Sequence, residues 1–307
     1  MSLITDEQIR RHISKVLKTY LRKPPYESEH RVTLYDLDSM GNLLREGRRD
    51  AKRDASKAYQ SELSISYLSI VTLAISHLAI NQKDDFNPPI KRDWIAGPDP
   101  NWIIANLLLQ VTNYSLAVVR LIEDGLDNAA RCVLRSLNEL CSQMLVLASN
   151  KDQLSIYAKA VTPDEAKQVW YELFAKKGRL SKSLQKLEAH FGLPTWLADD
   201  LKSFREDLNL THSQAVHHSF TSTVILAYSG DFENEEHLHS SLLGKATTAS
   251  RQTLDSLNIL LFYTVLMLVN ILVKVHGFKA PLNDRAWVSF FTLAECVKEV
   301  GAADDAR

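Results

Sequence analysis

The chain has 307 residues, of which 45% are apolar and 24% are charged, and its formal net charge is −1. This length predicts one large or two modest domains. A net charge so close to zero provides no overall field that attracts nucleic acid or anionic lipid, although it is compatible with a local basic patch. Ten Gly and nine Pro are few for this length, and no run of alternating Val, Ile and Thr predicts a strand. These features predict an all-α fold.

The cysteine pattern argues against disulfides and structural zinc. Cys132, Cys141 and Cys296 are odd in number, and no two of them have the Cys-x-x-Cys spacing. We therefore expect free, buried thiols in a reducing cytosol. The segment Met1–Lys23 is charged and amphipathic and lacks the apolar core of a signal peptide, so the expected location is cytoplasmic.

Two apolar segments bear on whether the chain contacts a membrane. Leu63–Ile80 carries several Ser and Thr residues, and Leu257–Val273 has no formally charged residue. The second segment contains Asn258 and Asn270 and is shorter than the ~20 residues that a transmembrane helix needs. We predict that it is the central helix of a bundle, buried on all sides, with a membrane helix as the alternative. No membrane contact is expected.

In chain order, the first predicted helix begins at Thr5 or Asp6 and runs to about Arg22. A charge-rich segment, Tyr35–Asp54, is predicted as a solvated helix that continues to about Ile80, with a phosphate-binding surface as the alternative. The Pro-rich segment that follows predicts a break in the helical structure. The predicted domain organisation is an N-terminal helical region (1–82) that packs on the main bundle, a Pro-rich linker or loop (83–100), the main helical bundle (101–300) and a disordered tail (301–307).

The bundle is expected to form around a central helical hairpin. Its first helix, Trp102–Asp124, is apolar apart from one narrow stripe, and Gly125 is typical of the residue that follows a helix end. Asp127 is expected to cap a second helix that runs to Ser149. So short a turn makes the two helices antiparallel neighbours. The polar stripes are Asn106, Gln110, Asn113, Arg120 and Asp124 on the first helix, and Arg131, Arg135, Asn138, Glu139 and Ser142 on the second.

Further helices follow the hairpin. Thr162 and Pro163, with acids after them, are typical of a helix start. Gly178 and Gly192 indicate helix ends. The predicted helices cover Asn150–Ala160, Pro163 to near Gly178, Ser181–Phe191, a long stretch from Thr195, Leu243–His276 and Asp284–Val300.

A first polar site is predicted within the hairpin. Arg135 and Glu139 lie one turn apart, a spacing typical of an ordinary ion pair worth a few tenths of a kcal/mol. If the two polar stripes face each other, however, they form a seam inside an apolar bundle, where unpaired groups are costly. We interpret the seam as a binding site, with a buried network that fixes the fold, or a solvated face, as the alternatives.

A second polar constellation lies between Phe204 and Phe220. An Arg and a His two turns apart can hold a phosphate and move a proton, although surface or capped histidines are more common. The histidines lack the spacing of the His-Glu-x-x-His zinc motif, so neither a metal nor a cofactor is expected. Gly-rich nucleotide motifs and the Gly-x-Ser-x-Gly hydrolase motif are absent, which excludes the common enzyme classes. The constellation consists of two neighbouring stripes, one of Arg205, Asn209 and His212 and one of Glu206, Ser213 and His217.

Three runs, Val119–Gly125, Arg135–Glu139 and His212–Ser219, resemble motifs of a bacterial all-α family that has no assigned activity. The resemblance covers roughly residues 100–230. It implies an all-α fold and supplies no activity. It marks, as recurrent polar positions of that family, Arg135, Glu139, Ser213 and His217.

A second resemblance is to the HEPN ribonucleases, all-α proteins of toxin and phage-defence systems. Their Arg-x4–6-His helix motif matches Arg205 and His212, which have six residues between them. This resemblance implies metal-independent cleavage of RNA by an Arg and a His that are held across a dimer. Glu206 departs from the motif, because a polar amide or Asp usually follows the Arg.

Two hypotheses for function follow, and both are compatible with a homodimer. One is a HEPN-like endoribonuclease that uses Arg205 and His212 and takes RNA as its substrate. The other is a non-enzymatic module, in stress or phage defence, that binds an unknown small ligand or protein partner. Its binding residues are Arg131, Arg135, Glu139, Ser213 and His217, and it places His217 within side-chain reach of Arg135 or Glu139.

Overall fold

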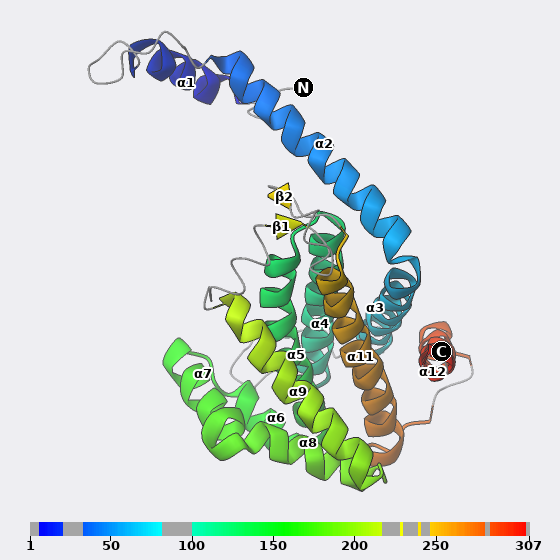
Figure 1. The fold of residues 1–307 in the computed structure, drawn as a ribbon. Coiled ribbons are helices and arrows are strands. Elements are labelled where there is room, and N and C mark those ends of the chain that lie inside the picture. Colours follow the sequence, from blue (N-terminus) through cyan, green and yellow to red (C-terminus); the bar gives the residue numbers. More distant parts are fainter. Residues whose placement is uncertain are drawn as a thin grey trace.

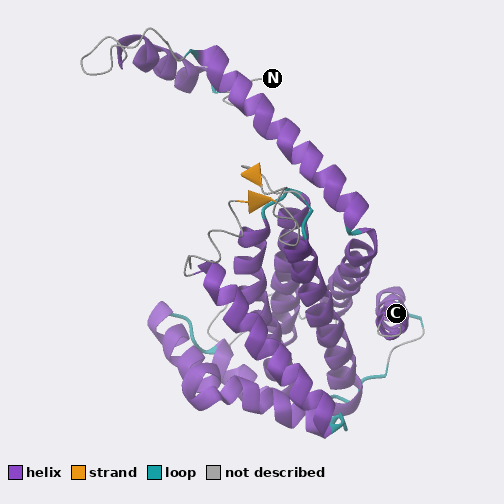
Figure 2. Ribbon diagram, in the orientation of Figure 1, coloured by secondary structure: helices purple, strands orange, loops and turns teal. Residues whose placement is uncertain are grey.

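The computed structural model describes residues 6–20, 33–81, 100–216, 228–229, 239–240, 246–279 and 283–304. The fold is all-α, as the composition predicts (Figures 1 and 2). Two-residue strands, β1 (Tyr228–Ser229) and β2 (His239–Ser240), pair antiparallel. The helices are α1 (Glu7–Tyr20), α2 (Leu34–Ala58), α3 (Gln60–Asn81), α4 (Pro100–Glu123), α5 (Asp127–Ser149), α6 (Lys151–Ala158), α7 (Pro163–Trp170), α8 (Arg179–His190), α9 (Thr195–Val216), α11 (Thr248–Asn270) and α12 (Arg285–Asp304).

Long helices stand side by side to make the bundle, and α6, α7 and α8 lie across one end of it (Figure 1). α4 packs between α3 and α5, and α5 packs in turn against α9 and α11. α11 also contacts α3 and α12. Single π-helical turns at Tyr171–Ala175 and Ile271–Val275 follow α7 and α11. α5 is therefore covered by helices on several sides, which its sequence pattern of one apolar face did not predict.

The central hairpin forms at the predicted glycine. Gly125 adopts a φ of 74°, and the Leu126 N–H donates to Leu121 O at 2.7 Å, as in a Schellman helix end. The expected capping role of Asp127 is wrong, because Leu126 occupies the N-cap and offers no side-chain hydrogen bond. Asp127 is the first helical residue instead, and its carboxylate accepts a hydrogen bond from the Thr253 hydroxyl of α11 at 2.8 Å.

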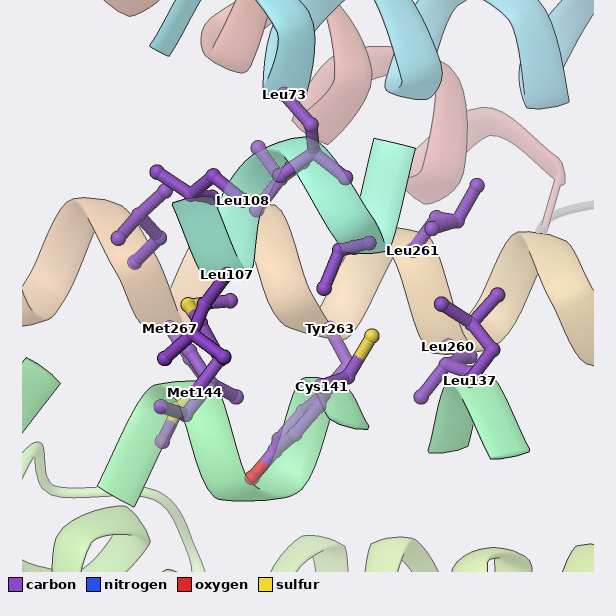
Figure 3. Packing of buried hydrophobic residues seen from close by; sticks show 14 of the residues in the cluster. Leu73, Leu107, Leu108, Leu137, Cys141, Met144, Leu260, Leu261, Tyr263 and Met267 are labelled. Atoms are coloured by element: carbon purple, nitrogen blue, oxygen red, sulfur yellow. The ribbon is translucent and has the colours of Figure 1, made fainter. Parts of the chain in front are cut away.

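The core fills the space between α3, α4, α5 and α11. Figure 3 shows Met144 of α5 and Met267 of α11 beside Leu107 of α4. Fully burying one such side chain stabilises the fold by about 1.5–3 kcal/mol, so this layer contributes a large part of the stability of the fold. Cys141 lies within it, and burial raises the pKa of its thiol to about 12.

α11 is a bundle helix, but the prediction that the segment Leu257–Val273 is buried on all sides is wrong, because Ile259 and Val273 are exposed. Several of its polar groups find partners inside the bundle. The Asn258 amide donates to Glu62 O at 3.0 Å and accepts from the Ser66 hydroxyl at 2.6 Å, both on α3. The Thr264 hydroxyl donates to the carbonyl of Leu260 one turn earlier, at 2.7 Å. These bonds explain how polar residues are accommodated in so apolar a helix.

Three helices are nevertheless long and apolar enough to cross a membrane by length and composition alone. They cover Gln60–Ile80, Asn101–Glu123 and Thr248–Val275, and at least half of the most apolar window of each is buried in the protein. The uncharged run Leu257–Val273 is part of the longer helix Thr248–Val275. The length of that run alone therefore does not argue against a membrane helix. The cytoplasmic location stays a prediction.

α1 and the first half of α2 form an arm that extends beyond the bundle (Figure 1). Asp6 caps α1 as predicted, because its carboxylate accepts from the Ile9 N–H at 2.9 Å. The two helices are joined by a bidentate ion pair in which Arg10 donates to both oxygens of Asp38 at 3.0 Å. The arm joins the bundle farther along α2, where Arg48 lies 2.7 Å from Asp124, the residue that follows α4.

α2 and α3 are separate helices, whereas the sequence predicted one continuous helix. The break is at Tyr59, whose backbone has φ −121° and ψ 31°. Its ring is buried and its hydroxyl donates to Thr247 O at 2.7 Å, which ties the break to the start of α11. α3 lies within the bundle, so the predicted N-terminal region is divided between the arm and the bundle.

Other predictions fall at the edges of the described residues. The Pro-rich segment before α4 lies outside them, apart from Pro100, which begins α4. The predicted tail begins within α12, which ends at Asp304. The expectation of buried thiols holds for Cys141 but not for Cys296, which is exposed on α12.

Candidate functional site

The polar stripe of α5 meets α9, not α4. The Asn138 amide donates to Asn209 Oδ1 at 3.0 Å and to Arg205 O at 3.4 Å. Asn138 is only 2% exposed, so these bonds are made in the interior. They join α5 to the part of α9 that carries Arg205 and Asn209. The two constellations found in the sequence are therefore adjacent in the fold.

The predicted seam between α4 and α5 is wrong. Gln110, Asn113 and Arg120 are exposed on α4, and the Asn106 amide donates to Trp102 O of its own helix. α4 buries its apolar sides between α3 and α5, which leaves its polar stripe facing solvent. The seam forms instead where α9 covers α5.

An ion pair is buried where α8, α9 and α11 meet, and we call it the Glu188 cluster (Glu188, Arg205 and Tyr263). Glu188 Oε1 accepts from Arg205 Nη1 and from the Tyr263 hydroxyl, each at 2.7 Å. The guanidinium also lies 5.3 Å from the centroid of the Tyr263 ring. Burial is the main cause that raises the pKa of Tyr263 above its ordinary value. In Figure 3 the Tyr263 side chain extends out of the apolar layer past α5.

The Glu188 cluster was missed in the sequence, although one signal pointed to it. Glu188 falls among Leu184, Leu187 and Phe191, which form the buried face of α8. A charged residue on an apolar stripe needs a partner of opposite charge, because an isolated buried charge is very costly. The partner, Arg205, lies on another helix, and the pairing depends on how α8 and α9 cross.

A cavity of about 280 Å³ opens between α5, α9 and α11. Its volume is close to the lower end of the ~300–1,000 Å³ typical of small-molecule sites. Its walls carry hydroxyls, an amide, an arginine, a carboxylate, an imidazole and one aromatic ring. The lining residues are Arg131, Phe204, Asp207, Leu208, Thr211, His212, Gln252, Thr253 and Ser256.

Arg131 is held at the wall of this cavity by one ion pair and one hydrogen bond. Nε lies 2.9 Å from Asp127 Oδ2 but makes no hydrogen bond within the described residues, and Nη2 donates to Ala249 O at 3.2 Å. Asp127 is fixed in turn by the hydroxyl of Thr253. Nη1 has no hydrogen-bond partner in the described part of the chain, so it is available to a ligand.

His212 is buried at the same wall with its hydrogen-bonding capacity unused. It is 5% exposed, and neither Nδ1 nor Nε2 has a hydrogen-bond partner within the described ranges. Burial, and secondarily the charge of Arg131, lowers the pKa of His212 to about 4. The imidazole is therefore neutral near pH 7, with one N–H donor and one acceptor nitrogen.

The other predicted site residues are less engaged. Arg135 and Glu139 are half-buried, and neither makes a hydrogen bond or ion pair within the described segments. The Ser213 hydroxyl donates to Asn209 O at 2.5 Å, a bond within its own helix. His217 lies outside the described residues, so its closeness to Arg135 or Glu139 stays a prediction.

The rest of the described structure offers few groups that could carry chemistry. Around the described side chains no three His, Cys, Asp or Glu residues are arranged to hold a metal ion. A second cavity, of about 400 Å³, is mainly apolar and lies between α4, α6 and α7 beside Trp102 and Tyr157. Polar groups converge at the α5–α9–α11 cavity, which makes it the stronger candidate.

No protein-family model, curated protein or solved structure matches this chain.

Proposed function

We propose that the protein is a non-enzymatic module that binds a small polar ligand in the α5–α9–α11 cavity through Arg131 and His212. The observation that carries the proposal is the buried, unpartnered imidazole of His212 at the cavity wall. Buried polar groups are almost always hydrogen-bonded, and a buried group left without a partner costs about 1–3 kcal/mol. A ligand that pairs with the ring recovers this cost, which favours binding.

The charges of the site support binding rather than catalysis. A general acid or base works best when its pKa is near the operating pH. The pKa of His212, about 4, is far below neutrality, so the ring is rarely protonated there. Arg205, its partner in the ribonuclease hypothesis, is 6% exposed and already bound to Glu188. Cleavage of RNA by these two residues is the competing prediction.

A ligand screen with matched variants tests the proposal. A panel of amino acids, carboxylic acids and nucleosides is added to the protein, and its melting temperature is measured by scanning fluorimetry. A ligand at about 100 times its Kd stabilises the folded state by about 2.7 kcal/mol, which is easily detected. Calorimetry then measures the Kd of each compound that raises the melting temperature.

His212→Leu and Arg131→Gln are expected to abolish binding of that compound. The matched control is His190→Ala, because His190 is an exposed histidine on α8 away from the cavity. A compound that binds equally well to His212→Leu, or a panel in which nothing binds, contradicts the proposal.

A further inference from the structure

The charged groups at the cavity are few and balanced. Within the described lining, Arg131 is the only cation and Asp207 the only anion. Asp127 lies 2.9 Å from Arg131 and neutralises part of its charge. His212 adds no charge near neutral pH, since its pKa is about 4. The site therefore has no excess of positive charge.

This balance argues against a ligand with several negative charges. Sites for phosphates and nucleic acid collect arginines and lysines, because each phosphate contact draws on a cation or a backbone N–H. Arg131 is the single cation here, and Asp207 would repel a second anionic group. A nucleotide or an RNA strand is therefore a poor match for this cavity.

The anion of the cavity, Asp207, lies on α9 with His212, whereas the cation, Arg131, lies on α5. Asp207 precedes His212 by five residues, a rise of about 7.5 Å along a helix. Asp207 is exposed and makes no hydrogen bond or ion pair in the part of the chain that the structure describes. Phe204, three residues before Asp207 on α9, also lines the cavity. The face of an aromatic ring attracts a cation. The lining therefore includes groups suited to an anionic group, Arg131 and His212, and groups suited to a cationic one, Asp207 and Phe204.

We propose that the ligand is a small zwitterion of the amino-acid type, whose carboxylate binds Arg131 and His212 and whose ammonium group binds Asp207 beside Phe204. The proposal rests on the proposed function, since it names the ligand class of the same cavity. Nη1 of Arg131 and the N–H of neutral His212 donate to the carboxylate, and a charge-assisted bond of this kind is among the strongest in proteins. The cavity volume of about 280 Å³ suits a molecule of this size.

Calorimetry with three probes of equal chain length tests the proposal. The probes are 5-aminopentanoate, pentanoate and pentylamine, which carry both charges, the negative charge alone and the positive charge alone. A hydrogen bond to a charged group contributes about 1.5–3 kcal/mol, so the zwitterion is expected to bind about tenfold or more tightly than either other probe. A series from glycine to 6-aminohexanoate should show one optimal chain length.

Two neighbouring carboxylates on α9 provide a matched pair of variants. Asp207→Asn is expected to bring the affinity for the zwitterion down to that for pentanoate, and Glu206→Gln to leave it unchanged. The Glu206 side chain is 62% exposed and does not line the cavity, so the two substitutions remove equal charge at different places. Melting temperatures confirm that both variants fold.

The outcomes separate this proposal from the one on which it rests. If pentanoate binds as tightly as the zwitterion, or if Asp207→Asn leaves the affinity for the zwitterion unchanged, the zwitterion proposal is overturned. The proposed function still stands in that case if His212→Leu abolishes binding of the singly charged probe. If no zwitterion of the series binds while a nucleoside from the wider panel binds and His212→Leu abolishes that binding, the zwitterion proposal is overturned and the proposed function stands.

Discussion

Replacing His212 with Leu should change the stability of the protein in a pH-dependent way. The wild-type imidazole is buried without a partner, so near pH 7.5 the apolar substitute is expected to raise the free energy of unfolding by about 1–2 kcal/mol. Leucine also fills most of the volume of the imidazole, which keeps the cavity from growing. A residue that lowers stability in this way is typical of a binding site.

The magnitude at low pH follows from the pKa of His212, which falls from 6.5 to about 4 on folding. Above about pH 6.5 the ring is neutral in both states, and protonation has no effect on stability. Between about pH 6.5 and 4 the unfolded chain binds a proton that the folded protein rejects, so the wild type loses stability as pH falls. A difference of 2.5 units, at 1.36 kcal/mol per unit, makes this loss on the order of 3 kcal/mol.

Urea unfolding followed by circular dichroism, at steps from about pH 7.5 to about pH 4.5, measures both effects. The advantage of His212→Leu over the wild type should grow as the pH falls. His190→Ala serves as the control, because His190 is an exposed histidine on α8 that does not line the cavity. An advantage that is the same at every pH would refute the reasoning, because His212 would then titrate as an ordinary, solvated histidine.

Further predictions concern the Glu188 cluster, the central hairpin and the ribonuclease hypothesis. Glu188→Ala leaves Arg205 buried without its carboxylate and should cost about 3–5 kcal/mol in urea unfolding, whereas Glu188→Gln paired with Arg205→Met should cost less; equal losses would contradict a buried ion pair. Gly125→Ala forces a φ of 74° on an L-residue and should lower the unfolding free energy by about 1 kcal/mol, and an unchanged stability would contradict that strain. Total RNA incubated with the protein, with and without chelator, should stay intact on a gel; cleavage lost in Arg205→Ala would favour the HEPN-like enzyme instead.

Much of the local structure could be predicted from short-range patterns. The start of α7 shows why, since the Thr162 hydroxyl accepts from the Glu165 N–H and the Glu165 carboxylate accepts from the Thr162 N–H. Such a capping box lies within four residues of sequence and needs no distant partner. The same holds for the cap at Asp6 and the positive φ of Gly125. The all-α class follows in the same way from composition and apolar periodicity, whereas the exposure of Ile259 on α11 and of Val273 just after it does not.

The candidate site could be predicted only in part, because its partners come from different helices. Periodicity correctly grouped Arg205, Asn209 and His212 on one face of α9, and it placed Arg131 on the polar face of α5. It assigned the facing surface to α4, and it provided no means of finding the carboxylate of Glu188. Helical periodicity shows which residues share a face, but it contains no information on which helix covers that face.

Tertiary packing determines which helix covers the polar face of α5, and it thereby determines the chemistry of the site. Because α9 rather than α4 covers the polar face of α5, His212 is buried beside Arg131 and its pKa falls to about 4. The same packing pairs Arg205 with Glu188, so a residue that could have bound phosphate is enclosed in the interior. Burial and the nearest charge set the state of an ionisable group, and both depend on neighbours that are distant in the sequence.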